Sequence, residues 1–475
     1  MIATTIGRTF LKAYNEKTGN GFSAKEFFEK EYVQAFYNHP LYMMSGGNSP
    51  LENPKISWKK GIRPSTEERQ DRITKTVSKI ESPLLDASVA IGYPASEERE
   101  YATTSGLITG MSIEITPEDK YLSWIGSGFG CCIKGGLSIF FSEPEILWNI
   151  YVGWKEYRKI LNDKTLVKIR GNQIEAWNAN WLTFLWNKRL YRQDFDFAYF
   201  VQIDVFKVDE QVVEINTIKW SSLFFSISNK FPEATFTGYI YSLGQTNTTL
   251  GFYPFHFIQA TSLIKFYKKL FGESIALDDT TIYENLFGLE IRKACQFGSI
   301  GLQALEPKSL RKYFGNDANI KLVKPKVSQK NGEPDDEYEE RKQKAYQKDN
   351  ENIITYRTYK TWLLAMITKN KEETLDYTAE VARALLEYRS RATKNDRKNL
   401  IQSELLGAKS KKGFIDALVS VVNGIKDDVN KDLTQEQELE IHKNLRDRVH
   451  LMSAEDFGYF VVLLKFDYAF AERNS

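Results

Sequence analysis

The clearest candidate for chemistry in this sequence is a run of cationic side chains between residues 383 and 412. The run holds nine lysines and arginines against three acids. Lysine and arginine neutralise the phosphates of a nucleic-acid backbone and release its counterions. A solvated helix face would show the same charge pattern, and charge alone supports the two interpretations equally. The residues expected to contact phosphates here are Arg389, Arg391, Lys394, Arg397 and Lys398.

Two further groups of polar side chains could contact a nucleic acid. Lys59, Lys60 and Arg63 flank Trp58, and cations beside an aromatic ring suit a strand by charge and by stacking. A surface loop held by one buried indole is the alternative. Arg170 is a further phosphate candidate. Amide side chains can read base edges, although asparagine in loops more often supports turns. The amide candidates are Asn172, Gln173, Asn178 and Asn247.

The strongest candidate for a catalytic site lies on a predicted hairpin. Asp204, Glu214 and Lys219 resemble the acids and lysine of a metal-dependent nuclease. However, Asn216 stands where that pattern needs a lysine, and the odd spacing from Glu214 to Lys219 predicts opposite faces of a strand. We therefore expect a protein that is not an enzyme and that has no cofactor and no metal. A metal-dependent nuclease of a defence system remains an alternative.

Three weaker motifs have structural explanations. The glycines at residues 126–130 resemble a dinucleotide-binding loop, but a predicted strand follows where that loop needs a helix, so we expect a turn. Glu438 and His442 are one helical turn apart and predict a surface pair. The three cysteines provide no disulfide framework. The sequence also shows no signal peptide and no long apolar run. We therefore expect a cytoplasmic protein without a membrane segment.

The elements that must position these residues indicate an α+β protein. We expect residues 1–320 to form a mixed, mainly antiparallel N-terminal and central domain that includes the candidate duplex-DNA region. Ser23 with Glu26 and Ser65 with Glu68 predict helix starts, and Pro144 predicts a third. The predicted strands are 87–91, 107–115, 137–141 and 235–241, and period-two alternation places the clearest hairpin at 197–218.

The last third of the sequence predicts an all-α helical bundle. Residues 321–352 are polar and charged and lack a core-forming period, so we expect a linker there. Residues 353–475 carry amphipathic stripes and capping signals. The predicted helices lie near 353–368, 372–392, 396–406, 412–425, 434–450 and 453–471.

The charge balance of the whole chain limits the function classes. It has 64 lysines and arginines against 62 acids, a formal net charge of +2. This near-neutral total excludes a uniformly basic binder, but it allows a local basic face. A protein-binding scaffold without nucleic-acid contact is a further alternative, in which the 30 phenylalanines, 25 tyrosines and 9 tryptophans serve interfaces.

Together these residues resemble the large subunit of a type I CRISPR Cascade complex, closest to types I-A and I-B. Many related large subunits carry two Cys-x-x-Cys pairs that bind zinc. This chain has only Cys131, Cys132 and Cys295, so it lacks that site. The resemblance is carried by Ala102-Thr103-Thr104-Ser105-Gly106, Trp124-Ile125-Gly126-Ser127-Gly128, Gly135-Gly136-Leu137-Ser138-Ile139, Pro144-Glu145-Ile146-Leu147-Trp148, and by Tyr377, Glu380, Val381, Leu385, Tyr388 and Arg389.

This resemblance implies a non-catalytic subunit. Its N-terminal domain would recognise the protospacer-adjacent motif on target DNA, while guide pairing reads the remaining sequence. Its helical bundle would follow the displaced strand and stabilise the R-loop. The implied partners are target DNA, the guide RNA ribonucleoprotein, other Cascade subunits and a helicase-nuclease.

Overall fold

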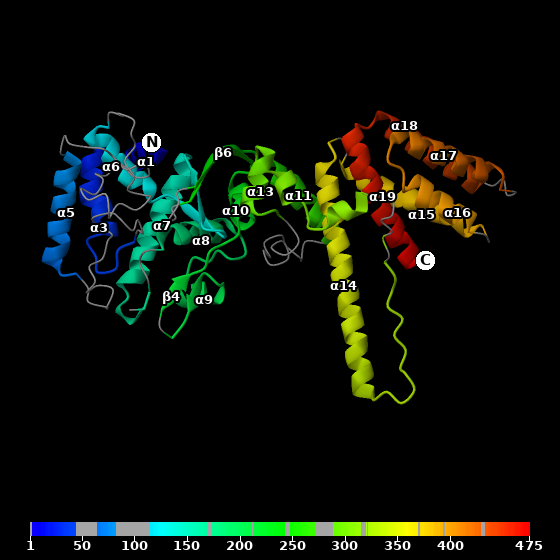
Figure 1. Cartoon of the computed structure of the whole chain (residues 1–475), viewed down its shortest axis with the longest axis horizontal. Helices are drawn as coiled ribbons and strands as arrows, with labels where there is room; N and C mark the ends of the chain where they lie inside the picture. The colour runs from blue at the N-terminus through cyan, green and yellow to red at the C-terminus, as the bar shows by residue number, and fades with distance from the viewer. Residues whose placement is uncertain are drawn as a thin grey trace. The chain divides into compact units, whose positions relative to one another are not determined.

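A computed structural model describes most of the chain (Figure 1), namely residues 2–43, 64–81, 115–166, 168–169, 173–210, 212–242, 248–271, 288–314, 320, 322–368, 371–392, 395–428 and 433–475. The predicted strands at 87–91 and 107–115 lie outside these residues, except for Ile115. The chain forms two compact units. Unit 1 is Met1–Ile258 with Glu290–Gly301, and unit 2 is Gln259–Leu289 with Leu302–Ser475. The predicted boundary near residue 320 is therefore wrong, because the chain crosses between the units at three earlier points.

Unit 1 combines helices with antiparallel sheets, which confirms the predicted α+β class. A four-stranded sheet has the order β1-β2-β5-β6, and β3 pairs with β4 in a separate two-stranded sheet. The strands are β1 (Cys131–Ile133), β2 (Leu137–Phe141), β3 (Phe206–Val208), β4 (Val213–Ile215), β5 (Thr235–Ser242) and β6 (Thr248–His256). The helices are α1 (Ile2–Thr18), α2 (Ala24–Phe27), the π-helical η1 (Phe28–Tyr32), α3 (Val33–Phe36), α5 (Thr66–Glu81), α6 (Pro117–Ser127), α7 (Pro144–Asn162), η4 (Lys164–Leu166), α8 (Ile174–Trp186), α9 (Phe197–Gln202), α10 (Trp220–Lys230), α13 (Ile291–Ala294) and η5 (Cys295–Phe297).

The predicted helix starts in unit 1 are confirmed. The Ser23 hydroxyl accepts from the Glu26 amide, and the Glu26 carboxylate accepts from the Ser23 amide. Ser65 and Glu68 make the same reciprocal bonds before α5. Pro144 is the first residue of α7, where a missing amide hydrogen costs nothing. These local signals specify helix starts without help from tertiary packing.

The hairpin predicted at 197–218 is only partly present. Its first third is the helix α9, because the Asp196 carboxylate accepts from the Tyr199 amide and caps that helix. The paired strands are confined to β3 and β4, in the register Phe206 opposite Ile215. Strand β6 continues to His256, and helix α11 (Phe257–Phe271) follows it directly.

Helices α1 and α6 cross at two glycines, Gly7 and Gly126. A Cβ atom at Gly126 would lie 2.7 Å from the Gly7 nitrogen and closer still to the Ala3 carbonyl oxygen. A Cβ atom at Gly7 would overlap the Leu122 carbonyl in the same way. The glycine-rich segment that resembled a nucleotide loop therefore includes a helix-crossing point, and Gly126 is there to let two backbones touch.

A half-buried carboxyl group, Glu175 of α8, lies against strand β2. The Ser138 hydroxyl of β2 donates to it. Burial raises the pKa of Glu175 to about 7, and the Ser138 hydrogen bond only partly opposes this shift. Below about pH 7 the folded protein therefore keeps this carboxyl protonated.

The position of Glu175 predicts that unit 1 loses stability as the pH rises from 4.5 to about 7. The unfolded chain releases the Glu175 proton near pH 4.5, whereas the folded chain keeps it until about pH 7. Glu175→Gln cannot ionise, so denaturant unfolding across this range should show a flatter profile, with a difference of about 3 kcal/mol at the alkaline end. Parallel profiles for the variant and the wild type would contradict the assignment.

Unit 2 is mainly helical, with α15, α17, α18 and α19 around one apolar core. The predicted bundle helices are confirmed at nearly the expected residues. The elements are α11 (Phe257–Phe271, whose first two residues belong to unit 1), η6 (Leu302–Leu305), η7 (Leu310–Phe314), α14 (Asp335–Met366), α15 (Lys371–Ser390), α16 (Asp396–Asn399), the π-helical η8 (Leu400–Leu405), α17 (Lys411–Lys426), α18 (Leu433–Leu451) and α19 (Ala454–Asn474).

The linker predicted at 321–352 is wrong in its second half, because α14 begins at Asp335. This helix has 32 residues, and its first buried residue is Thr358. Three acids in its first turn interact favourably with the helix dipole, and Glu340 pairs with Lys344 one turn further along. At its start, Arg341 donates to the Glu333 carboxylate. Local charge pairing therefore supports a helix where no core-forming period exists.

Candidate nucleic-acid interface

The structure describes about half of the residues predicted to contact nucleic acid. Arg389, Arg391, Arg397, Lys398, Gln173 and Asn178 are described. The other candidates lie outside the described residues, and these are Lys59, Lys60, Arg63, Arg170, Asn172, Asn247 and Lys394.

The prediction that Asn178 reads base edges is wrong, because its side chain is fully buried. Its amide nitrogen donates to the carbonyls of Gly128 and Gly130, both at 2.8 Å. Its amide oxygen accepts from the Trp154 indole at 3.1 Å. Asn178 thus holds the chain between α6 and β1 on the interior of unit 1. Gln173 also serves the fold, since its oxygen accepts from the Ile215 amide at 2.7 Å.

The arginines of the basic run are engaged within the bundle. Arg391 donates to both Glu438 oxygens, at 2.6 and 2.7 Å, and lies 3.2 Å from Asp428. Arg397 donates to both oxygens of Asp428 and to the Tyr388 carbonyl. We call Arg391, Arg397, Asp428 and Glu438 the arginine–carboxylate cluster. It joins the ends of α15 and α17 to α16 and α18.

Arg389 has a similar role elsewhere in the bundle. It donates to the Glu472 carboxylate at 2.5 Å and to the Tyr468 hydroxyl at 3.0 Å, both on α19. The predicted displaced-strand contacts of Arg389, Arg391 and Arg397 are therefore not supported. Guanidinium groups suit such pairs because their planar forks match carboxylates.

The prediction that Glu438 and His442 form a surface pair is wrong. Neither is a surface residue, since Glu438 is 6% exposed and His442 is fully buried. Burial lowers the pKa of His442, so the imidazole stays neutral. The hydrogen bond from Arg397 lowers the pKa of Asp428, which keeps that carboxylate ionised at neutral pH.

Three lysines of the same run differ from the arginines in their ion pairing. Lys398, Lys409 and Lys412 have no acidic partner among the described residues, and we call them the lysine set. Lys409 and Lys412 are exposed at the start of α17, and Lys398 is half-buried on α16. An ammonium on a flexible stem remains solvated and free to meet a phosphate. The sequence prediction included Lys398 but omitted Lys409 and Lys412, although both belong to the basic run.

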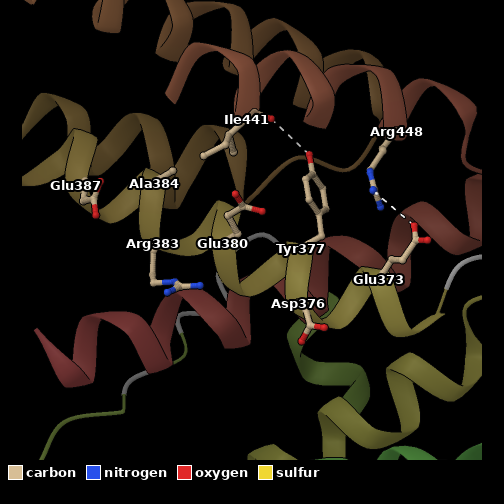
Figure 2. A pocket seen from close by; sticks show the side chains of 9 residues that line it. All are labelled: Glu373, Asp376, Tyr377, Glu380, Arg383, Ala384, Glu387, Ile441 and Arg448. Carbon is tan, nitrogen blue, oxygen red and sulfur yellow. Dashed lines mark hydrogen bonds and ion pairs between the residues drawn. The ribbon is translucent and has the colours of Figure 1, made fainter. Parts of the chain in front are cut away.

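A second surface of unit 2 is acidic. A groove of about 580 Å³ lies between α15 and α18, with Tyr377, Ala384 and Ile441 among its lining residues. Figure 2 shows Glu373, Asp376, Glu380 and Glu387 along α15, against only Arg383 and Arg448. The α15 residues recur every three or four positions, so they share one helix face. Glu373 is paired with Arg448 and Asp376 with Lys269. Glu380 and Glu387 are therefore the acids that would repel a phosphate here and attract a cationic protein segment.

The described residues do not form the metal site that the nuclease alternative requires. Lys219 precedes α10 as its N-cap and is not on the hairpin. The Asp204 carboxylate accepts from the Asn216 amide at 3.0 Å. Within the described ranges, no group of three His, Cys, Asp or Glu side chains could hold a metal ion. The same part of the chain contains no helix long and apolar enough to cross a membrane.

Comparison with protein-family models, with curated proteins and with solved structures gives no match for this chain. The resemblance to a Cascade large subunit therefore stays a hypothesis.

Proposed function

We propose that the chain is a non-catalytic, nucleic-acid-binding large subunit of a type I CRISPR Cascade complex in the cytoplasm. In this role it recognises the protospacer-adjacent motif and stabilises the R-loop. Its partners are target DNA, the guide RNA ribonucleoprotein, other Cascade subunits and a helicase-nuclease. The observation that carries the proposal is the lysine set, because these cations of the basic run have no acidic partner among the described residues.

The arginine–carboxylate cluster gives the lysine set a fixed support. Arg391 and Arg397 pair with acids on both sides of Lys398, so the cluster links the segment that carries this lysine to the ends of α17 and α18. Contact of each with one phosphate contributes about 0.7 to the salt-dependence slope for a single strand. The proposal therefore places the strand contact on the lysines and the folding role on the arginines.

The test compares two triple variants of the full chain. Lys398→Ala/Lys409→Ala/Lys412→Ala should weaken binding of a labelled single-stranded oligonucleotide by tenfold or more, and lower the salt slope by about 2. The control is Lys342→Ala/Lys344→Ala/Lys443→Ala, which removes the same charge from exposed lysines already paired with acids. Fluorescence anisotropy from about 50 to about 200 mM salt measures both. Equal losses in the two variants would reject a specific role for the lysine set.

The acidic groove favours a second candidate, a protein-binding scaffold. Four carboxylates against two arginines suit a cationic segment of a protein partner and disfavour DNA. The same titration separates the candidates. A scaffold without nucleic-acid contact predicts no salt-dependent binding of the oligonucleotide by the wild type.

A further inference from the structure

The arginine–carboxylate cluster of unit 2 borders a histidine that takes no part in its ion pairs. His442 lies on α18, one helical turn after Glu438, and its side chain is fully buried. Its Nδ1 donates to the Glu438 carbonyl at 2.7 Å. Its Nε2 is also buried and has no hydrogen-bond partner among the described residues. A neutral imidazole suits this position, because only one of its two nitrogens then needs an acceptor.

The surroundings of His442 disfavour its protonation. Burial lowers the pKa of His442 below its ordinary value of 6.5, and the nearby Arg391 guanidinium acts in the same direction. The Glu438 carbonyl and carboxylate oppose this shift without cancelling it. Tyr388 of α15 interacts with the same charges, and burial raises the pKa of its hydroxyl, so it stays neutral. At neutral pH the cluster therefore holds two guanidinium groups against two carboxylates, with an uncharged imidazole beside them.

Protonation of His442 would disturb this balance. The Nε2 would become a second donor without an acceptor, and a buried charge is costly unless it is paired and hydrogen-bonded. The carboxylate that attracts the imidazolium belongs to Glu438, but both of its oxygens already accept from Arg391, at 2.6 and 2.7 Å. The imidazolium and the guanidinium would therefore compete for one carboxylate. The cluster would then hold three cations against two carboxylates.

The two halves of α18 are held in different ways. In the first half, residues 433–442, the buried residues that the structure describes are Gln435, Glu438 and His442, and none of them is apolar. Gln435 donates to a backbone carbonyl of α17. In the second half, Leu445 and Val449 are fully buried in the apolar core of the bundle. Polar contacts thus fix the first half, and a change of charge there can release it while the second half stays packed.

We propose that the first half of α18 is an acid-operated latch, which opens when His442 takes up a proton and displaces Arg391 from Glu438. The step adds one proton from solvent to the Nε2 of His442 and breaks the two hydrogen bonds between Arg391 and Glu438. Arg391 keeps its contact with Asp428 at 3.2 Å, so the end of α15 stays joined to the end of α17. The inference goes beyond the proposed function, because the latch requires no nucleic acid.

The pH dependence of the latch has a definite sign. An opened chain binds the His442 proton near pH 6.5, whereas the closed chain binds it only at a lower pH. Between these two values opening takes up one proton, so the closed state loses stability as the pH falls. Uptake of one proton changes the opening equilibrium by at most about tenfold per pH unit. Above about pH 7.5 the latch should show no further dependence on His442.

Hydrogen–deuterium exchange of the full chain, resolved on peptides of α18, measures the opening. The test variant is His442→Asn, whose amide keeps a donor at the position of Nδ1 and cannot be protonated. We compare exchange at about pH 5.5 with exchange at about pH 7.5, since the intrinsic rates then cancel between proteins. This ratio, in the first half of α18, should be up to about tenfold larger for the wild type than for the variant. The matched control is His450→Asn, which changes an exposed histidine of the same helix and should keep the wild-type ratio.

A second measurement needs no variant. Exchange of the histidine C2 hydrogens in the wild type reports the titration of each ring, and His442 should titrate below pH 6.5 and exchange more slowly than the exposed His450. Titration of His442 at or above pH 6.5 would overturn the inference, as would equal ratios for the wild type and His442→Asn. Joint opening of α15, α17 and α18 would also overturn it, because acid would then unfold the bundle as a whole. The proposed function fails on separate grounds, since its test measures the salt slope of the lysine set.

Discussion

Gly126→Ala should destabilise unit 1 by about 3 kcal/mol, at the upper end of the cost of overpacking. The added Cβ would be forced into the Ala3 carbonyl oxygen and would lie 2.7 Å from the Gly7 nitrogen. Both neighbours are backbone atoms of α1, so no side chain can turn away to make room. Helices α1 and α6 must then separate and expose the aromatic core beneath them.

Denaturant unfolding followed by tryptophan fluorescence measures this effect, because Trp124 lies on α6 and is fully buried. The matched control is Gly458→Ala in α19, where the Cβ meets nothing within 4 Å. That substitution should stabilise unit 2 by up to about 1 kcal/mol through helix propensity. A Gly126→Ala protein as stable as the wild type would show that α1 and α6 do not cross in contact.

Lys360→Met should destabilise unit 2 by about 3–5 kcal/mol, the usual cost of leaving a buried charge unpaired. The Lys360 ammonium donates to the Asp467 carboxylate, and the two side chains are only 9% and 4% exposed. Methionine keeps most of the volume but removes the charge, so the Asp467 carboxyl loses its cation in the contact between α14 and α19.

The double variant Lys360→Met/Asp467→Leu separates charge from packing. Because both charges are removed together, its unfolding free energy should return to within about 1 kcal/mol of the wild type or exceed it. A surface control, Lys344→Met, removes an exposed pair with Glu340 and should change stability by less than about 1 kcal/mol. If both lysine variants unfold alike, the Lys360 pair does not stabilise the fold.

Much of the fold was predictable because its signals are local. The capping pair Ser23 and Glu26 and the first-turn Pro144 act within one helical turn, and each began a helix where expected. Prediction from apolar periodicity failed where a helix cap or local charge pairs decided the outcome. Residues 197–202 alternate like a strand, yet the Asp196 cap makes them helical. The first half of α14 has no apolar stripe, and its charge pairs support the helix instead.

The candidate site could be predicted only in part, because a local charge count includes only nearby acids. Arg391 pairs with Glu438, 47 residues away, and Arg389 pairs with Glu472, 83 residues away. Only folding brings these acids to the arginines. The distinction between paired arginines and free lysines therefore required the structure. Gln173 and Asn178 show the same limit, since nothing local indicates that an amide will be buried.

The interleaved order of the two units has a consequence for synthesis on the ribosome. The last bridge of unit 1 joins Phe255 to Ile300, with Ile300 donating to Pro254 at 2.8 Å and accepting from His256 at 2.9 Å. The intervening segment Gln259–Leu289 belongs to unit 2. The first-made unit therefore cannot complete its fold until part of the second has emerged. A nascent chain arrested before residue 300 would leave the edge of β6 unpaired, so folding must wait for translation to pass that point.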